Sequence, residues 1–167
     1  MNQLQGLLDT LEEAHQKGFI SEKCKLIMGD FIQNYGEAVT SSGGDLQEVV
    51  NIFTQYISIL KDLHQNPYSF EPYHEQIRSP VDYYQFGLDF TRPLIAEDQS
   101  ACLGEENLVE IEKHIKAKEN VILLANHQTE GDPQLISLLL EKKHHELERD
   151  MIFVAGHRVT EDILAVP

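Results

Sequence analysis

The residues best suited to chemistry are His127 and Asp132, which four residues separate in the polar stretch after the apolar run 121–125. A neutral imidazole can take a proton from a hydroxyl group near pH 7. A carboxylate bonded to the other ring nitrogen fixes the tautomer and stabilises the imidazolium that forms. Such a pair would activate an alcohol that the substrate itself brings, for attack on an ester or thioester carbonyl.

Other roles for these residues are open. Asp132 followed by Pro133 is a favoured start of a helix, and a helix cap requires no catalysis. His127 is one of eight histidines, and its spacing to an aspartate can arise by chance. Both roles of Asp132 can coexist. Metal-assisted hydrolysis by His127, Glu130 and Asp132 is a weaker alternative, because catalytic zinc needs three ligands that one short loop rarely supplies.

The segments on either side of the pair have the pattern of a β-α-β unit. Residues 121–125 predict a buried strand, and residues 151–155 predict a second one. Residues 133–143 carry leucines at helical spacing between them. This order predicts parallel strands joined by a right-handed crossover. The first strand would deliver His127 to a loop, and the following helix N-terminus would offer free N–H groups to an anion.

Three helices are predicted in residues 1–78, where apolar residues recur at spacings of three and four. Ser21 and Asp45 are expected to cap the second and third of them. We place a domain boundary near Ser79-Pro80, where this periodicity gives way to an aromatic block. The predicted fold class is therefore α/β, with an antiparallel N-terminal helical bundle in residues 1–78. The start of a mixed α/β domain would follow in residues 79–167.

Further helices are expected closer to the site. Residues 82–92 would form one that Pro93 breaks. Asn107 is expected to cap another that runs to Lys118. The tract 142–145, Lys-Lys-His-His, resembles a metal site only superficially. It is expected to be a solvated helix end, where cations suit the helix dipole.

Composition narrows the classes of function. The net charge of −15 argues against nucleic acid and against electrostatic docking on anionic lipid. No apolar run in the sequence approaches the roughly 20 residues that span a bilayer. Cys24 and Cys102 match no metal or redox spacing, so a reducing compartment is expected. With no secretory signal in the N-terminal sequence, the expected location is the cytoplasm, or the plastid stroma for a mature plastid form.

Residues 126–133, which read Asn-His-Gln-Thr-Glu-Gly-Asp-Pro, resemble the H-x4-D block of the glycerolipid acyltransferases. Within that group, the chain resembles the soluble glycerol-3-phosphate acyltransferases of plastids and their relatives in some intracellular bacteria. Residues 80–95 resemble the start of that family's catalytic domain, and residues 151–159 resemble its next core strand and turn. Gly131 stands where the family has alanine, and His157 where it has an acidic residue.

The resemblance implies transfer of a fatty acyl group from acyl carrier protein or acyl-CoA to the sn-1 hydroxyl of glycerol 3-phosphate. The product would be 1-acylglycerol 3-phosphate, in the first step of phospholipid synthesis. His127 would be the general base and Asp132 would hold it; no cofactor or metal is implied. Backbone N–H groups near Thr129 to Gly131 are candidate oxyanion donors. The other motif residues expected to support the site are Asn126, Thr129, Glu130 and Gly131.

The family continues well past the position that matches Pro167, through blocks whose basic residues hold the glycerol phosphate. The chain is therefore expected to stop partway through its catalytic domain and to be inactive alone. Docking of the acidic acyl carrier protein would also need a basic patch, which these residues do not supply. If Pro167 is the natural terminus, the alternative is a non-catalytic helical interaction module, whose incomplete sheet would call for a partner.

Overall fold

The computed structural model describes residues 3–69, 71, 73, 77–156, 159 and 164. The chain divides into two compact units, Met1–Leu94 with Ala155–Pro167, and Ile95–Val154. Of the helices in the described part of the chain, none combines the length and the apolar character needed to cross a bilayer. The domain boundary expected near Ser79-Pro80 stays a prediction.

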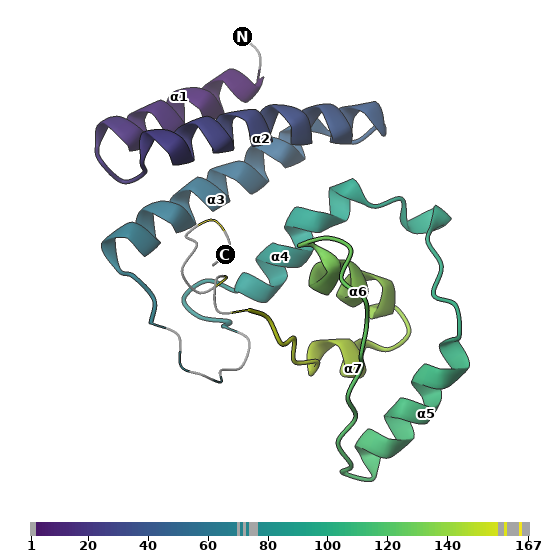
Figure 1. Ribbon diagram of the computed structural model, residues 1–167. Helices are drawn as coiled ribbons and strands as arrows, with labels where there is room; N and C mark the ends of the chain where they lie inside the picture. Colours follow the sequence, from purple (N-terminus) through teal and green to yellow (C-terminus); the bar gives the residue numbers. More distant parts are fainter. Residues whose placement is uncertain are drawn as a thin grey trace. The chain divides into compact units, whose positions relative to one another are not determined.

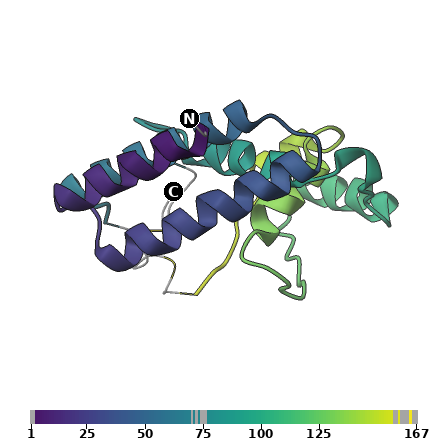
Figure 2. The same ribbon diagram turned by 90° about the horizontal axis from the view of Figure 1, so that it is seen from above.

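In the first unit, α1 (Gln3–Gln16), α2 (Glu22–Ser41) and α3 (Leu46–Gln65) pack side by side, and consecutive helices run in opposite directions (Figures 1 and 2). The three predicted N-terminal helices are thus confirmed. Each turns one apolar face to a common core, since residues three and four apart share a helix face. The largest fully buried apolar side chains are Leu11, Met28, Ile32, Phe53, Ile57 and Leu60.

Local capping explains where these helices begin and end. Ser21 Oγ accepts a hydrogen bond from the N–H of Cys24 at 3.1 Å, and Asp45 Oδ1 accepts one from the N–H of Gln47 at 2.8 Å. Both predicted caps are confirmed, and each satisfies a backbone donor that the first turn of a helix leaves open. Gly18 follows α1 with φ at +76°, a left-handed conformation that glycine adopts without strain.

A cluster of aromatic rings joins α4 (Tyr83–Thr91) to α2 and α3. Its six members are Phe31, Tyr35, Phe53, Tyr56, Phe86 and Phe90. The hydroxyl of Tyr35 donates to the carbonyl oxygen of Phe90 at 2.5 Å, so its burial leaves no unpaired donor. Burial raises the pKa of Tyr35, which keeps this hydroxyl protonated.

The helix predicted over residues 82–92 is confirmed as α4, which begins after Asp82. The carboxylate of Asp82 accepts the N–H of Gln85 at 2.9 Å. The predicted break at Pro93 is also confirmed, since the chain continues as the short 3-10 helix η1 (Arg92–Leu94). Proline cannot donate the backbone hydrogen bond that would extend the α-helix.

The second unit contains η2 (Glu97–Gln99), α5 (Glu105–Lys116), α6 (Asp132–Leu140) and α7 (His145–Arg149). The predicted cap at Asn107 is wrong, because α5 begins two residues earlier. Gly104 precedes it with φ at +78°, and its carbonyl oxygen accepts the N–H of Asn107 at 2.9 Å. The turn that Gly104 makes therefore fixes where the helix starts.

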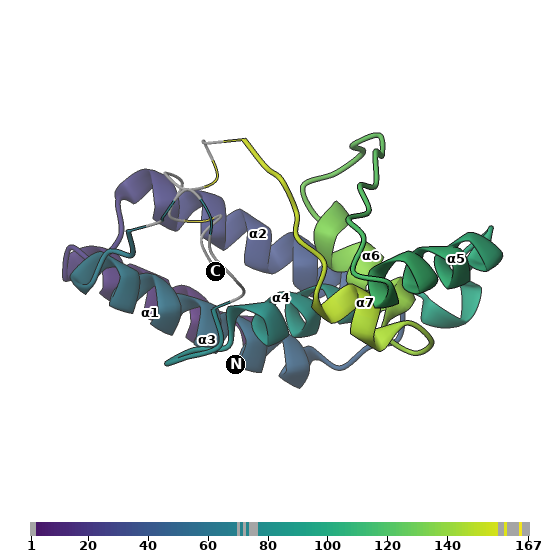
Figure 3. The same cartoon turned by 90° about the horizontal axis from the view of Figure 1, so that it is seen from below.

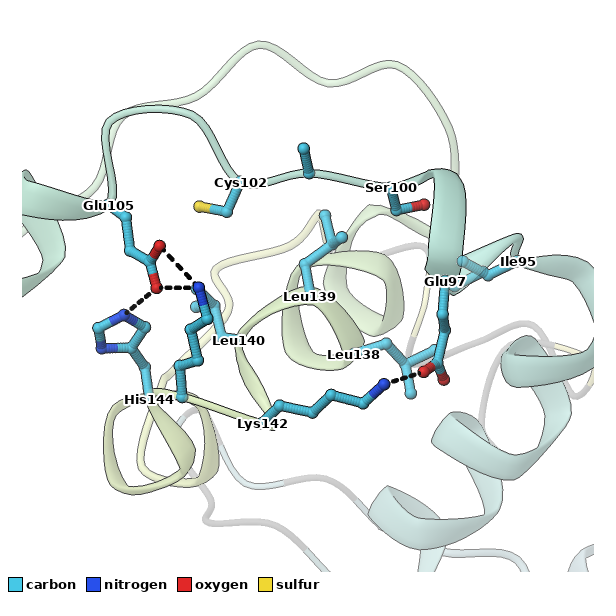
Figure 4. A pocket seen from close by; sticks show the side chains of 12 residues that line it. Ile95, Glu97, Ser100, Cys102, Glu105, Leu138, Leu139, Leu140, Lys142 and His144 are labelled. Atoms are coloured by element: carbon cyan, nitrogen blue, oxygen red, sulfur yellow. Dashed lines mark hydrogen bonds and ion pairs between the residues drawn. The ribbon is translucent and has the colours of Figure 1, made fainter.

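The tract after α6 is solvated at Lys142, Lys143 and His145, whose side chains are 72%, 69% and 62% exposed, and only His144 departs from the predicted helix end. The imidazole of His144 is only 8% exposed, and its Nδ1 lies 2.7 Å from Glu112 Oε1. Its Nε2 lies 3.5 Å from Glu105 Oε1, and Glu105 also pairs with Lys143 at 2.9 Å. Figure 4 shows Glu105 pointing toward His144, and Lys142 pointing toward Glu97. This tract therefore fastens α5 and η2 to the end of α6.

The predicted β-α-β unit is wrong, because neither 121–125 nor 151–155 forms a strand and no strand occurs among the described residues. Figure 3 draws the chain leading into α6 as an irregular trace. Ile122, Leu124 and Val154 are 81%, 95% and 97% exposed. A strand exists only where its N–H and C=O groups find a partner strand, and the described residues offer none. The intervening α6 forms nevertheless, because its hydrogen bonds are internal.

Replacing Phe53 by alanine should lower the free energy of unfolding of the first unit by about 3–5 kcal/mol. The ring is fully buried and its centroid lies 5.1 Å from that of Tyr35 and 5.8 Å from that of Phe90. Urea denaturation followed by circular dichroism measures the change. Leu26→Ala on α2 is the control, because Leu26 is 58% exposed. A similar loss for both variants would contradict this packing.

Candidate active site

The structure brings His127 and Asp132 together at the start of α6. His127 lies in the irregular segment between α5 and α6, and Asp132 is the first residue of α6. Nδ1 of His127 and Oδ2 of Asp132 are 2.8 Å apart, a hydrogen-bond distance. The two residues selected from their spacing therefore make contact, while their catalytic role stays a prediction.

The carboxylate of Asp132 points back into the loop and does not cap α6. Its Oδ2 accepts the N–H of Gln128 at 2.7 Å, and the N–H of Thr129 lies 3.2 Å from Oδ1 and 3.3 Å from Oδ2. The cap position of α6 belongs to Gly131, which has no side chain to bond the helix. The helix-cap reading of Asp132 is thus wrong, and its carboxylate instead closes the loop that carries His127.

These bonds also fix the charge of Asp132. The N–H of Gln128 lowers the pKa of Asp132, and His127 and the N–H of Thr129 lower it further. Each donor stabilises the ionised carboxylate more than the protonated acid. Asp132 therefore acts only as an acceptor, so the Nδ1 of His127 must be the donor of their shared hydrogen bond.

Exposure separates the roles of the two side chains. The side chain of Asp132 is 20% exposed, whereas that of His127 is 65% exposed. With Nδ1 donating to the carboxylate, the neutral ring carries its lone pair on Nε2, which has no partner among the described residues. The arrangement presents an oriented base on the accessible side of the loop.

A histidine beside a carboxylate is common in this chain. Among the described residues, four other histidines lie within ion-pair distance of a glutamate, namely His15, His114, His144 and His145. In the exposed pair of His114 and Glu119, Nδ1 and Oε2 are 2.5 Å apart. What distinguishes Asp132 is that two backbone N–H groups of the histidine's own loop also hold its carboxylate. The loop thereby fixes the orientation of the base.

The loop also narrows the choice of oxyanion donor. The N–H of Thr129 donates to Asp132, and the N–H of Gly131 donates to the Oγ1 of Thr129 at 2.9 Å. Both N–H groups, which the sequence made candidate oxyanion donors, therefore already donate within the loop. Of the three residues 129–131, only Glu130 has an N–H without a partner among the described residues.

Sequence reasoning missed the bonds that build this loop. The backbone N–H of Gln128 leaves no trace in the residue types. The hydroxyl of Thr129 could have been found, because serine and threonine often accept the N–H two residues ahead in a turn. Asn126 lies in the exposed part of the segment. His157, the expected departure from the family pattern, lies outside the described residues.

The pH dependence of the loop follows from Asp132. Because folding lowers its pKa below the ordinary value of about 3.9, the stabilisation that it contributes is complete above about pH 4. This contribution should be lost as the pH falls through the lower pKa of the folded chain. A carbon-13 titration of the Asp132 carboxyl group measures that pKa, with the urea-unfolded chain as reference. Equal midpoints in the two states would contradict the geometry.

Comparison with known proteins shows which sequences the chain resembles. The family described as Acyltransferase matches residues 106–166, which include His127 and Asp132. The chain is 36% identical over 166 residues to "Glycerol-3-phosphate acyltransferase ATS11, chloroplastic" of Cucurbita moschata, covering 98% of this chain and 37% of that protein.

Two further relatives carry the name "Glycerol-3-phosphate acyltransferase, chloroplastic". That of Spinacia oleracea is 35% identical over 164 residues, covering 96% of this chain and 34% of the relative. That of Arabidopsis thaliana is 35% identical over 166 residues, covering 98% and 36%. The chain thus spans about a third of the length of these relatives. Residues 106–166 thus match the acyltransferase family, and nearly the whole chain is similar to part of the chloroplast glycerol-3-phosphate acyltransferases.

Proposed function

We propose that this chain supplies the general base of an enzyme that transfers a fatty acyl group to the sn-1 hydroxyl of glycerol 3-phosphate. The observation that carries the proposal is the 2.8 Å contact between His127 Nδ1 and Asp132 Oδ2, which leaves Nε2 on the accessible side of the loop. The names of the relatives support the acceptor and the reaction. The donor would be a thioester of acyl carrier protein or coenzyme A.

The reaction follows from the orientation of the imidazole. Nε2 of His127 takes the proton of the sn-1 hydroxyl as its oxygen attacks the thioester carbonyl, and a carbon–oxygen bond forms. Asp132 stabilises the imidazolium through Nδ1. Collapse of the tetrahedral intermediate breaks the carbon–sulfur bond, and the imidazolium returns its proton to the departing thiolate. The products are 1-acylglycerol 3-phosphate and the free thiol carrier.

The negative charge of the intermediate needs a hydrogen-bond donor. The N–H of Glu130 is the candidate, because those of Thr129 and Gly131 already bond within the loop. A backbone donor in a loop that is held by its own hydrogen bonds costs little reorganisation during the reaction.

The names of the relatives also support a location. They are described as chloroplastic, which favours the plastid stroma for this chain; the cytoplasm is the alternative. Residues 79–167 would belong to the catalytic domain in this proposal, and residues 1–78 to the N-terminal helical domain.

A non-catalytic helical interaction module is the second candidate function. The observation that favours it is the exposure of the apolar runs around Ile122, Leu124 and Val154, because exposed apolar stretches often mark contacts with another protein. This candidate gives no role to the bonded pair of His127 and Asp132, so an activity assay separates the two functions.

Replacing His127 by alanine should lower acyl transfer by about 10²- to 10⁴-fold, which is the usual contribution of a general base. The assay would use a chimera in which residues 1–167 replace the matching segment of the Spinacia oleracea relative. Formation of 1-acylglycerol 3-phosphate from labelled glycerol 3-phosphate and an acyl thioester is the measurement. Turnover of His127→Ala within a few-fold of the unaltered chimera would refute the assignment.

The matched control is His114→Ala, since this histidine also lies beside a carboxylate on an exposed surface. Its loss should change turnover by less than twofold. Equal losses for His114→Ala and His127→Ala would mean that the assay reports stability. An unaltered chimera with no acyl transfer would favour the interaction module.

A further inference from the structure

Thr129 makes three hydrogen bonds within the candidate site, to Gly131 and Asp132. Its Oγ1 accepts the N–H of Gly131 at 2.9 Å. Its N–H donates to the carboxylate of Asp132, 3.2 Å from Oδ1. Its carbonyl oxygen accepts the N–H of Asp132 at 3.1 Å. The backbone N–H, the backbone carbonyl oxygen and the hydroxyl oxygen of this one residue therefore all bond to the two residues that end the loop.

The hydroxyl has a distinct task among these groups. Two of the contacts are made by the backbone, which any residue at this position would provide. Only the Oγ1 belongs to the side chain, and it holds the N–H two residues ahead, as threonine does in tight turns. Gly131 lies between Thr129 and Asp132 in this turn, with φ at −85° and ψ at 3°. Fixing its N–H fixes the path of the chain into Asp132.

The environment of Gly131 agrees with this task. A Cβ added to Gly131 would lie 3.4 Å from the Oγ1 of Thr129, at the edge of ordinary van der Waals contact. Because φ of Gly131 is negative, the turn does not depend on the conformational freedom of glycine. The turn is held by backbone and carboxylate bonds between Thr129 and Asp132, and the bond from the hydroxyl to the N–H of Gly131 adds a side-chain contact to them.

We propose that Thr129 is a positioning residue, whose hydroxyl holds the turn that places the carboxylate of Asp132 against Nδ1 of His127. The catalytic meaning of this role rests on the proposed function, whereas the role itself is a property of the loop. Thr129 acts through Asp132. Among the described residues, no hydrogen bond joins Thr129 to the imidazole of His127. Its hydroxyl also occupies the N–H of Gly131, so the N–H of Glu130 is the remaining candidate donor to a substrate oxygen.

The test uses the 167-residue chain and two substitutions. Thr129→Val keeps the shape of the side chain and removes the hydroxyl, whereas Thr129→Ser keeps the hydroxyl. Nitrogen-15 spectra of His127 report which ring nitrogen carries the proton, and hydrogen exchange reports protection of the Gly131 amide. In the unaltered chain, the proton should reside on Nδ1 of the neutral ring.

Thr129→Val should speed exchange of the Gly131 amide by about 3- to 10-fold, the equivalent of one lost hydrogen bond. It should also shift the neutral ring of His127 toward the tautomer protonated on Nε2, because the carboxylate no longer stays in place. Thr129→Ser should restore both signals. Thr54→Val is the control, since the hydroxyl of Thr54 bonds to Val50 within α3 and should leave both signals unchanged.

Two results would overturn the proposal. One is a Thr129→Val chain whose His127 tautomer and Gly131 exchange equal those of the unaltered chain. The other is failure of Thr129→Ser to restore them, which would assign the effect to the methyl group. Neither readout needs acyl transfer, so an inactive chimera would count against the proposed function and leave this result standing.

Discussion

The loop that carries His127 depends on one carboxylate. Asp132 accepts hydrogen bonds from the N–H groups of Gln128 and Thr129 and from Nδ1 of His127. A carboxylate with several donors stays ionised and oriented, because each bond favours the charged form. The segment before it is largely exposed, with Ile122 at 81% and Leu124 at 95%. Hydrogen bonding, and not burial, gives this part of the chain its shape.

The first unit is stabilised in the opposite way. Its helices bury apolar faces, and α4 is held through rings that surround Phe53 and through the bond from Tyr35 to Phe90. Burial of large aromatic side chains contributes about 1.5–3 kcal/mol each, which outweighs a single exposed hydrogen bond. Because the two parts of the chain are stabilised differently, amino-acid substitutions in them should have different effects. Core substitutions change unfolding of the first unit, whereas substitutions in the loop change the orientation of His127.

The wrong strand predictions have a common physical origin. Residues 121–125 and 151–155 have the apolar composition of buried strands, yet composition gives only a preference. A strand also needs partners from elsewhere in the chain for its backbone groups, and these partners are set by tertiary structure. A helix needs no such partner, which is why α6 forms between the two runs. The start of α5 was predicted more closely than the strands were. The helix begins at Glu105, two residues before the predicted cap at Asn107, because Gly104 turns the chain there.

The sequence by itself determined what local chemistry controls. The spacing of apolar residues predicted α1, α2 and α3, the oxygens of Ser21 and Asp45 marked two helix starts, and the motif selected His127 with Asp132. The tertiary structure decided which way each polar group points. It turned the carboxylate of Asp132 back into the loop, and it buried His144 between two glutamates of α5. Residue types set which bonds a group can make, but only the folded chain sets which partners lie within about 3 Å of it.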